Sequence, residues 1–207
     1  DLNTNASIYA DEIIFTYNML QTVGSDAKVY MSLDHSWNHN DDGRGLAGKE
    51  FLPAVVNAIN SKQPGVEWNV AYHAYPPIMT NSDIWSSSQY WNHTIYTPFI
   101  CGSNLEVLTN FIRDNYGEEH RVILSEQGFD ANNGDTRQAA ALAYTYYAAQ
   151  FNDMVDAVIF RSYFDDKNDG SFKFGLRNGY VQDVSEGNLS SVGYRQSYYV
   201  FKYMDTN

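Results

Sequence analysis

The sequence predicts an α/β fold in which parallel strands alternate with helices. Four short runs are apolar throughout, which is typical of strands in a parallel sheet whose outer face is covered by helices. A longer segment whose apolar residues have helical spacing follows each run. No linker or repeat divides the chain, so residues 1–207 are expected to form one domain.

The predicted elements follow one another in a regular order. Apolar residues at helical spacing predict a first helix over Ala6–Val23, with Gly24 as its stop signal. Four strands are then expected, over Lys28–Asp34, Glu67–Tyr75, Arg121–Glu126 and Asp156–Tyr163. A helix is expected after each of them, over Leu46–Ser61, Asn104–Tyr116, Asp135–Asn152 and Tyr194–Met204. The predicted pattern is α(βα)4.

Two parallel architectures fit this pattern: a small doubly wound sheet of the flavodoxin type, and half of a TIM (β/α)8 barrel. The predicted strand centres are on average about 43 residues apart, so eight such units would need roughly 340 residues, within the range of TIM barrels. If the chain is part of a barrel, we expect it to supply the C-terminal half, strands five to eight with their covering helices. Exposed apolar sheet edges would favour the half barrel.

Composition and motifs exclude several partners and cofactors. Thirteen Lys and Arg against 25 Asp and Glu give a net charge of −12, so no nucleic-acid partner is expected. No apolar run approaches the roughly 20 residues that span a bilayer, so no membrane partner is expected. No Gly-rich phosphate loop follows a predicted strand, His35 and His39 lack a third ligand, and Asp165–Gly170 does not keep EF-hand spacing. We therefore expect neither a cofactor nor a metal. The single cysteine leaves the compartment open, with a secreted or periplasmic location slightly favoured.

Polar and aromatic side chains gather after the predicted strands, where parallel α/β folds bind ligands. Glu126 directly follows an apolar run and is the leading catalytic candidate. The candidates for substrate binding lie at the four strand ends: His35, Trp37, His73, Tyr75, Gln127, Arg161 and Tyr163. Trp37 is preferred over Trp85 and Trp91 for stacking on a sugar ring. Each of these residues also has a structural interpretation. Glu126 could form a salt bridge with Arg161, and His73 and Tyr75 could pack in the interior of the sheet.

Three stretches resemble the retaining (β/α)8 glycoside hydrolases, whose acid/base and nucleophile are glutamates at the ends of strands four and seven. Arg121–Phe129 resembles strand seven of that superfamily, and Tyr72–Pro76 resembles strand six. Thr97–Ile100 followed by Asn104–Thr109 is similar to a bacterial branch of predicted glycosidases. The resemblance covers nearly the whole chain and implies that Glu126 is the nucleophile.

The second carboxyl group of this chemistry is missing. The superfamily's acid/base follows an asparagine, and no Asn-Glu pair occurs in the 207 residues. The resemblance thus implies a hydrolase that is incomplete in this chain, with an acid/base upstream, a carbohydrate substrate, and either the missing N-terminal half-barrel or a second copy as partner. Asp34 and Asp165 are weaker candidates for the acid. The alternatives are a carbohydrate-binding protein without turnover and a flavodoxin-like domain that binds a ligand or partner.

Overall fold

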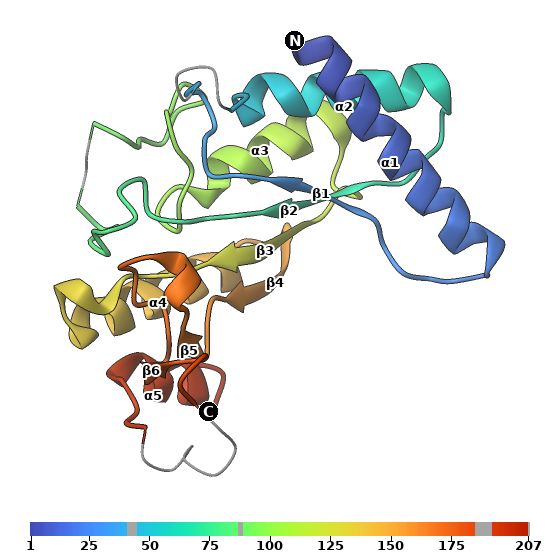
Figure 1. Ribbon diagram of the computed structural model, residues 1–207. Coiled ribbons are helices and arrows are strands. Elements are labelled where there is room, and N and C mark those ends of the chain that lie inside the picture. The colour runs from blue at the N-terminus through green and yellow to red at the C-terminus, as the bar shows by residue number, and fades with distance from the viewer. Residues whose placement is uncertain (41–44, 87–88, 185–191, 207) are drawn as a thin grey trace.

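Four parallel strands form the central sheet of the computed structural model, which describes residues 1–40, 45–86, 89–184 and 192–206. The strands β1 (Tyr30–Leu33), β2 (Asn69–Tyr72), β3 (Val122–Gln127) and β4 (Val155–Phe160) lie side by side in chain order (Figure 1). A doubly wound sheet reverses its strand order at a switch point, and this sheet does not. The predicted half-barrel arrangement of parallel strands is confirmed, and the flavodoxin-like alternative is wrong.

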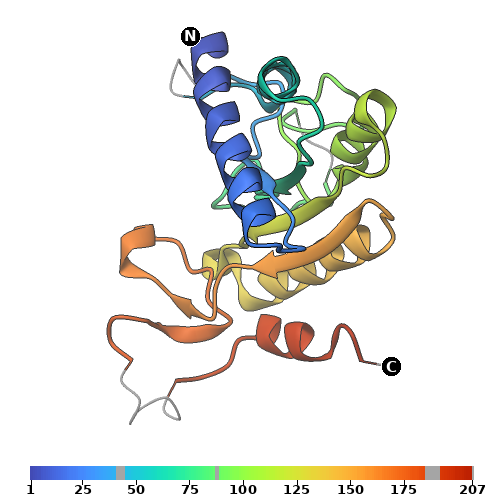
Figure 2. The same ribbon diagram turned by 90° about the vertical axis from the view of Figure 1, so that its right-hand side faces the viewer.

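The predicted helices are confirmed, with ends that differ by a few residues. They are α1 (Leu2–Thr22), α2 (Gly48–Lys62), α3 (Leu105–Tyr116), α4 (Asp135–Gln150) and α5 (Gln196–Tyr203). The first helix begins before the predicted Ala6 because the Asp1 carboxylate caps it, accepting a 3.0 Å hydrogen bond from the Thr4 amide. Figures 1 and 2 show α5 beside α4, at the opposite end of the molecule from α1. No helix within the described ranges is both long and apolar enough to cross a membrane.

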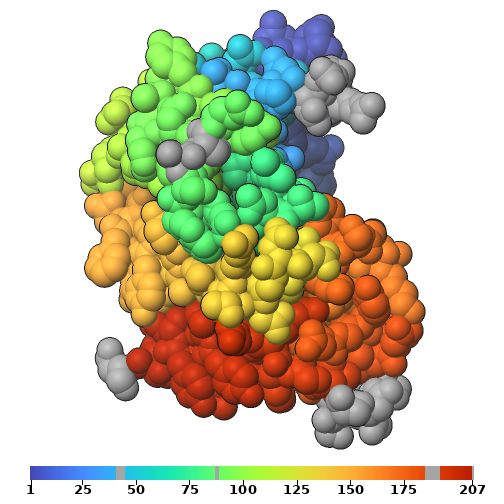
Figure 3. Space-filling view, turned by 90° about the vertical axis from the view of Figure 1, so that its left-hand side faces the viewer, coloured from blue at the N-terminus to red at the C-terminus, as the bar shows by residue number. Residues whose placement is uncertain are grey.

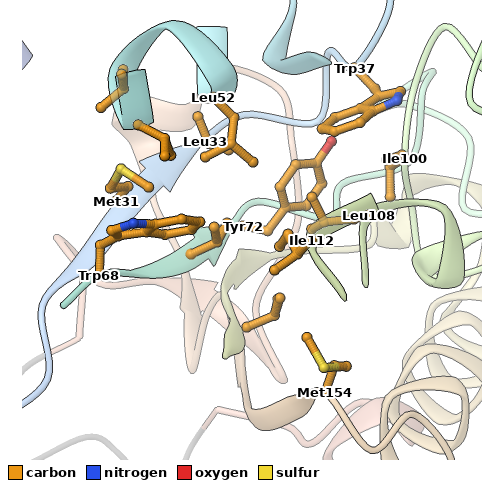
Figure 4. Close-up of a cluster of buried hydrophobic side chains, with 14 of the residues drawn as sticks. Met31, Leu33, Trp37, Leu52, Trp68, Tyr72, Ile100, Leu108, Ile112 and Met154 are labelled. Atoms are coloured by element: carbon orange, nitrogen blue, oxygen red, sulfur yellow. The ribbon is translucent and has the colours of Figure 1, made fainter. Parts of the chain in front are cut away.

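Alternation along the strands divides their side chains between two faces. Met31, Leu33 and Tyr72 are buried in a cluster with residues of α2 and α3 (Figure 4). Residues between them, such as Ser32, belong to the opposite face because successive side chains point to opposite sides of a strand. That second face is open at β4, where Ile159 is 55% exposed.

A second, smaller sheet was not predicted. After β4 the chain forms β5 (Phe164–Asp165), the 3-10 helix η2 (Lys167–Asp169) and β6 (Arg177–Tyr180), and β5 pairs with β6 in parallel. Another 3-10 helix, η1 (Ala131–Asn133), precedes α4. Figure 3 shows the long segment between β2 and α3, in green, and the segment after β4, in orange, on the same face of the molecule.

Candidate active site

A β-bulge in β3 turns Glu126 toward the open face of the sheet. Leu124 pairs with Val158 and Gln127 pairs with Phe160, so β3 uses one residue more than β4 over this stretch. Leu124 and Gln127 are both fully buried, whereas Glu126 between them keeps a side chain that is 31% exposed. Regular alternation would place Leu124 and Glu126 on the same face, and the extra residue of the bulge separates them.

Side chains from the ends of the two neighbouring strands meet the Glu126 carboxylate. Its Oε1 accepts hydrogen bonds from Arg161 Nη1 at 2.6 Å, after β4, and from the Tyr75 hydroxyl at 3.0 Å, after β2. His73 Nδ1 lies 3.4 Å from Oε2, and His73 Nε2 lies 3.2 Å from the Ser32 hydroxyl of β1. The structure therefore brings together Glu126, His73, Tyr75 and Arg161. The salt bridge between Glu126 and Arg161, given above as a structural alternative, is present.

Hydrogen bonding keeps the carboxylate charged. Burial raises the pKa of Glu126, but the hydrogen bonds from Arg161 and Tyr75, together with electrostatic interactions with His73 and Arg161, hold its pKa below the ordinary glutamate value. Burial, followed by the hydrogen bond to Glu126, raises the pKa of Tyr75, so its hydroxyl stays a donor. The hydrogen bond to Glu126 also raises the pKa of Arg161. An ionised carboxylate at neutral pH is what a nucleophile requires.

A pocket of about 410 Å³ opens beside this carboxylate. Glu126 and Arg161 line it together with Tyr163, Phe164 and Asp166. Tyr163, predicted to bind substrate, is 47% exposed and so presents its ring to solvent at the pocket. His35 lies near the group as well, because the centroids of its ring and the Tyr75 ring are 6.5 Å apart.

Two predicted binding residues lie outside the site. Trp37 is fully buried, with its ring 5.2 Å from that of Phe111 and its Nε1 donating to the Ile95 carbonyl. Gln127 is also fully buried, and its amide donates to backbone carbonyls. The structure therefore does not expose either predicted substrate-binding side chain, Trp37 or Gln127, for contact with a ligand. Of the other tryptophans, Trp91 is buried and Trp85 is 42% exposed.

The carboxylates considered for the acid have other surroundings. Asp165 is buried in a bidentate ion pair with Arg195, at 2.9 and 2.7 Å, so it is not available as a proton donor. Asp34 is exposed and lines a different hollow of about 530 Å³ beside β1 and α1. The backbone amide of Asn168 holds the pKa of Asp166 below its usual range, which disfavours Asp166 as an acid. No cluster of three potential metal ligands occurs among the residues that the structure describes.

Two neighbours of the site were not predicted from the sequence. Asp169 accepts a hydrogen bond from the second terminal nitrogen of Arg161 and so shares that guanidinium with Glu126. The Phe174 ring lies 5.8 Å from the Tyr75 ring and also fills the space beside Gly128, where an added Cβ would stand 2.9 Å from it. The glycine that follows Glu126 and Gln127 was the sequence signal for this close approach.

The comparisons with known proteins agree with this architecture. A family model described as "Family of unknown function (DUF5722)" matches residues 1–207. No curated protein sequence matches the chain. Fpglu1 of Fervidobacterium pennivoraus is 17% identical with a TM-score of 0.50, over 90% of this chain and 45% of its own. A β-glucosidase mutant derived from a hyperthermophilic tetrameric structure is 16% identical with a TM-score of 0.50, over 93% of this chain and 44% of its own.

These two comparisons concern the fold alone, because the identities are low. The chain spans less than half the length of either solved structure. It has the fold of part of a TIM barrel.

Proposed function

The chain belongs to the DUF5722 family, and we propose that it is the part of a retaining glycoside hydrolase barrel that carries the nucleophile, Glu126. The single observation that carries the proposal is the Glu126 carboxylate at the carboxyl end of β3, held by Arg161 and Tyr75 beside an open pocket. Retaining chemistry also needs a second carboxyl group to protonate the leaving group. The two aspartates described beside this group do not suit that role, because the pKa of Asp166 is lowered and Asp169 is paired with Arg161. The acid/base is therefore assigned to residues beyond this group, upstream of the chain.

The geometry distinguishes the two oxygens of the nucleophile. Oε1 receives both hydrogen bonds, which leaves Oε2 to attack the anomeric carbon of a bound sugar. The bond from that carbon to the leaving oxygen breaks as the ester bond to Oε2 forms, and the leaving oxygen takes its proton from the acid/base. Water, deprotonated by the same acid/base, then hydrolyses the ester and frees Glu126.

A mechanism-based probe tests the nucleophile without needing the acid/base. 2,4-Dinitrophenolate departs without a proton, so 2,4-dinitrophenyl 2-deoxy-2-fluoro glycosides should leave a sugar ester on the protein even where the acid is absent. We expect one label, located on Glu126 by peptide mass spectrometry, for at least one member of a gluco, galacto, manno and xylo panel. Glu126→Gln should take no label, and Glu118→Gln, at an exposed position, should label normally.

Hydrolysis gives the second measurement. In the natural protein, Glu126→Gln should lower turnover of the sugar that labels best by roughly 10³-fold or more, in a variant that remains folded. A label on another residue, no label across the whole panel in a folded protein, or a fully active Glu126→Gln variant would contradict the assignment.

A carbohydrate-binding protein without turnover is the second candidate. The observation that favours it is the 2.6 Å ion pair with Arg161, which gives Glu126 a structural role that needs no chemistry. The labelling experiment separates the two candidates, because sugar binding by calorimetry without any covalent label would support the binding protein.

A further inference from the structure

We propose that Gln127 is a positioning residue whose buried side-chain amide holds the β-bulge that presents Glu126 to the open face. The inference concerns the geometry of Glu126, and only its kinetic consequence rests on the proposed function. Gln127 touches neither the pocket nor the carboxylate of Glu126, so it acts through the backbone.

The hydrogen bonds of Gln127 lie on both sides of the bulge. Nε2 donates to the carbonyl of Leu124, the last regularly paired residue before the bulge, at 3.4 Å. It also donates to the carbonyl of Ile159, which lies across from the bulge on β4, at 2.5 Å. A bulge interrupts the regular ladder and leaves backbone groups in need of partners. One primary amide carries two N–H donors and can serve both carbonyls.

The backbone of Gln127 supports the partner of Glu126 as well. The Gln127 carbonyl accepts a 2.9 Å hydrogen bond from the amide of Arg161. Gln127 therefore contacts the bulge through its side chain. Through its main chain it also supports the backbone of Arg161, whose guanidinium binds Oε1.

Loss of the amide should let this part of β3 relax toward regular alternation. Regular alternation would turn the side chain of residue 126 toward the helices and away from Arg161 and Tyr75. The carboxylate would then lose the two hydrogen bonds that keep it charged, while still being removed from water. A purely structural glutamine would lower stability without changing the protonation of Glu126.

Titration of the Glu126 carboxyl carbon by NMR, in natural protein labelled with 13C at glutamate Cδ, tests the proposal directly. The Glu126→Gln variant assigns the signal. Gln127→Met keeps the length of the side chain but removes the donor, and it should raise the pKa of Glu126 by about one unit or more. Asn69→Leu is the matched control, because Asn69, at the start of β2 and far along the sheet, is also a buried amide, and it donates to the Val29 carbonyl just before β1. It should lower the melting temperature and leave the Glu126 titration unchanged.

The outcomes separate this inference from the proposed function. A folded Gln127→Met variant with the wild-type titration overturns the inference, even if wild-type protein takes the sugar label. A shifted titration in a protein that never takes a label supports the inference and contradicts the proposed function. If the inference and the proposed function are both correct, the rate of sugar labelling should be at least tenfold lower in Gln127→Met and unchanged in Asn69→Leu. If Gln127→Met does not fold, Gln127→Asn, which keeps the amide but cannot reach both carbonyls, should give the same shift, and an unshifted titration there would overturn the inference.

Discussion

Glu126 depends on Tyr75 and Arg161 for its charge, and these two donors differ in what else they do. Arg161 also binds Asp169, so it has a second anionic partner. Tyr75 gives its hydroxyl hydrogen bond to Glu126 and packs its ring against Phe174. The tyrosine can therefore be altered with less disturbance of the surrounding charges.

Tyr75→Phe should raise the pKa of Glu126 by about one unit, because it removes a hydrogen bond to the charged form and keeps the ring. A carboxyl whose pKa is lowered by folding contributes stability above its unfolded pKa, and that contribution disappears as pH falls through the folded pKa. The acid limb of the pH profile for sugar labelling should therefore move upward in Tyr75→Phe, and the variant should gain less stability between acid and neutral pH than the wild type.

Tyr96→Phe is the control, because Tyr96 is 70% exposed and is not among the residues around Glu126. The acid limb is measured from labelling rates between about pH 3 and 7. If the acid limb of Tyr75→Phe coincides with that of the wild type, Tyr75 does not lower the pKa of Glu126.

The residues of the site could be predicted from the sequence only in part. The positions of Glu126, His73 and Arg161 follow from the rule that polar side chains at strand ends converge. The orientation of Gln127 depends on the bulge, which no residue pattern indicates. Trp37 follows β1 but its backbone amide binds the Pro98 carbonyl, which folds the loop inward and buries the ring.

The segment after β4 owes its shape to one buried ion pair. Asp165 of β5 and Arg195 before α5 are both 3% exposed, and Arg195 also donates to the carbonyls of Gly175 and Arg177. The pair fastens the small sheet that carries the Tyr163 side of the pocket. This sheet was not predicted, because β5 has only two residues and Arg177–Tyr180 of β6 is not an apolar run.

Asp165→Asn should lower the free energy of unfolding by about 3–5 kcal/mol, because it removes the bidentate carboxylate from the buried Arg195 charge and leaves the more distant, partly exposed Asp135 at 3.6 Å. The control is Asp183→Asn, which removes an exposed ion pair with Lys167 in the same segment and should cost less than about 1 kcal/mol. Urea unfolding at neutral pH measures both. Equal losses in the two variants would show that burial of the pair does not govern the stability of this segment.

The whole molecule presents an open sheet. Its strand order leaves β1 and β4 at the edges of the described sheet. At β1 the amide of Ser32 donates to the Tyr9 hydroxyl of α1 at 2.7 Å, which satisfies one edge group. At β4 the open face carries the exposed side chain of Ile159. The regular spacing of strands and helices predicted this layout, since each βα unit adds one strand beside the last.

The isolated 207-residue chain should therefore self-associate, because association would pair the backbone groups of the edge strands and bury the exposed apolar face. We expect light scattering to give a mass above that of one chain at micromolar concentration. Ile159→Lys should shift the equilibrium toward the monomer by placing a charge on the open face. Phe151→Lys is the matched control, since Phe151 is 86% exposed at the end of α4 and does not belong to the sheet. A monomeric wild-type chain, or the same mass for both variants, would contradict this prediction. The expectation of a second half-barrel would then depend only on the missing acid/base.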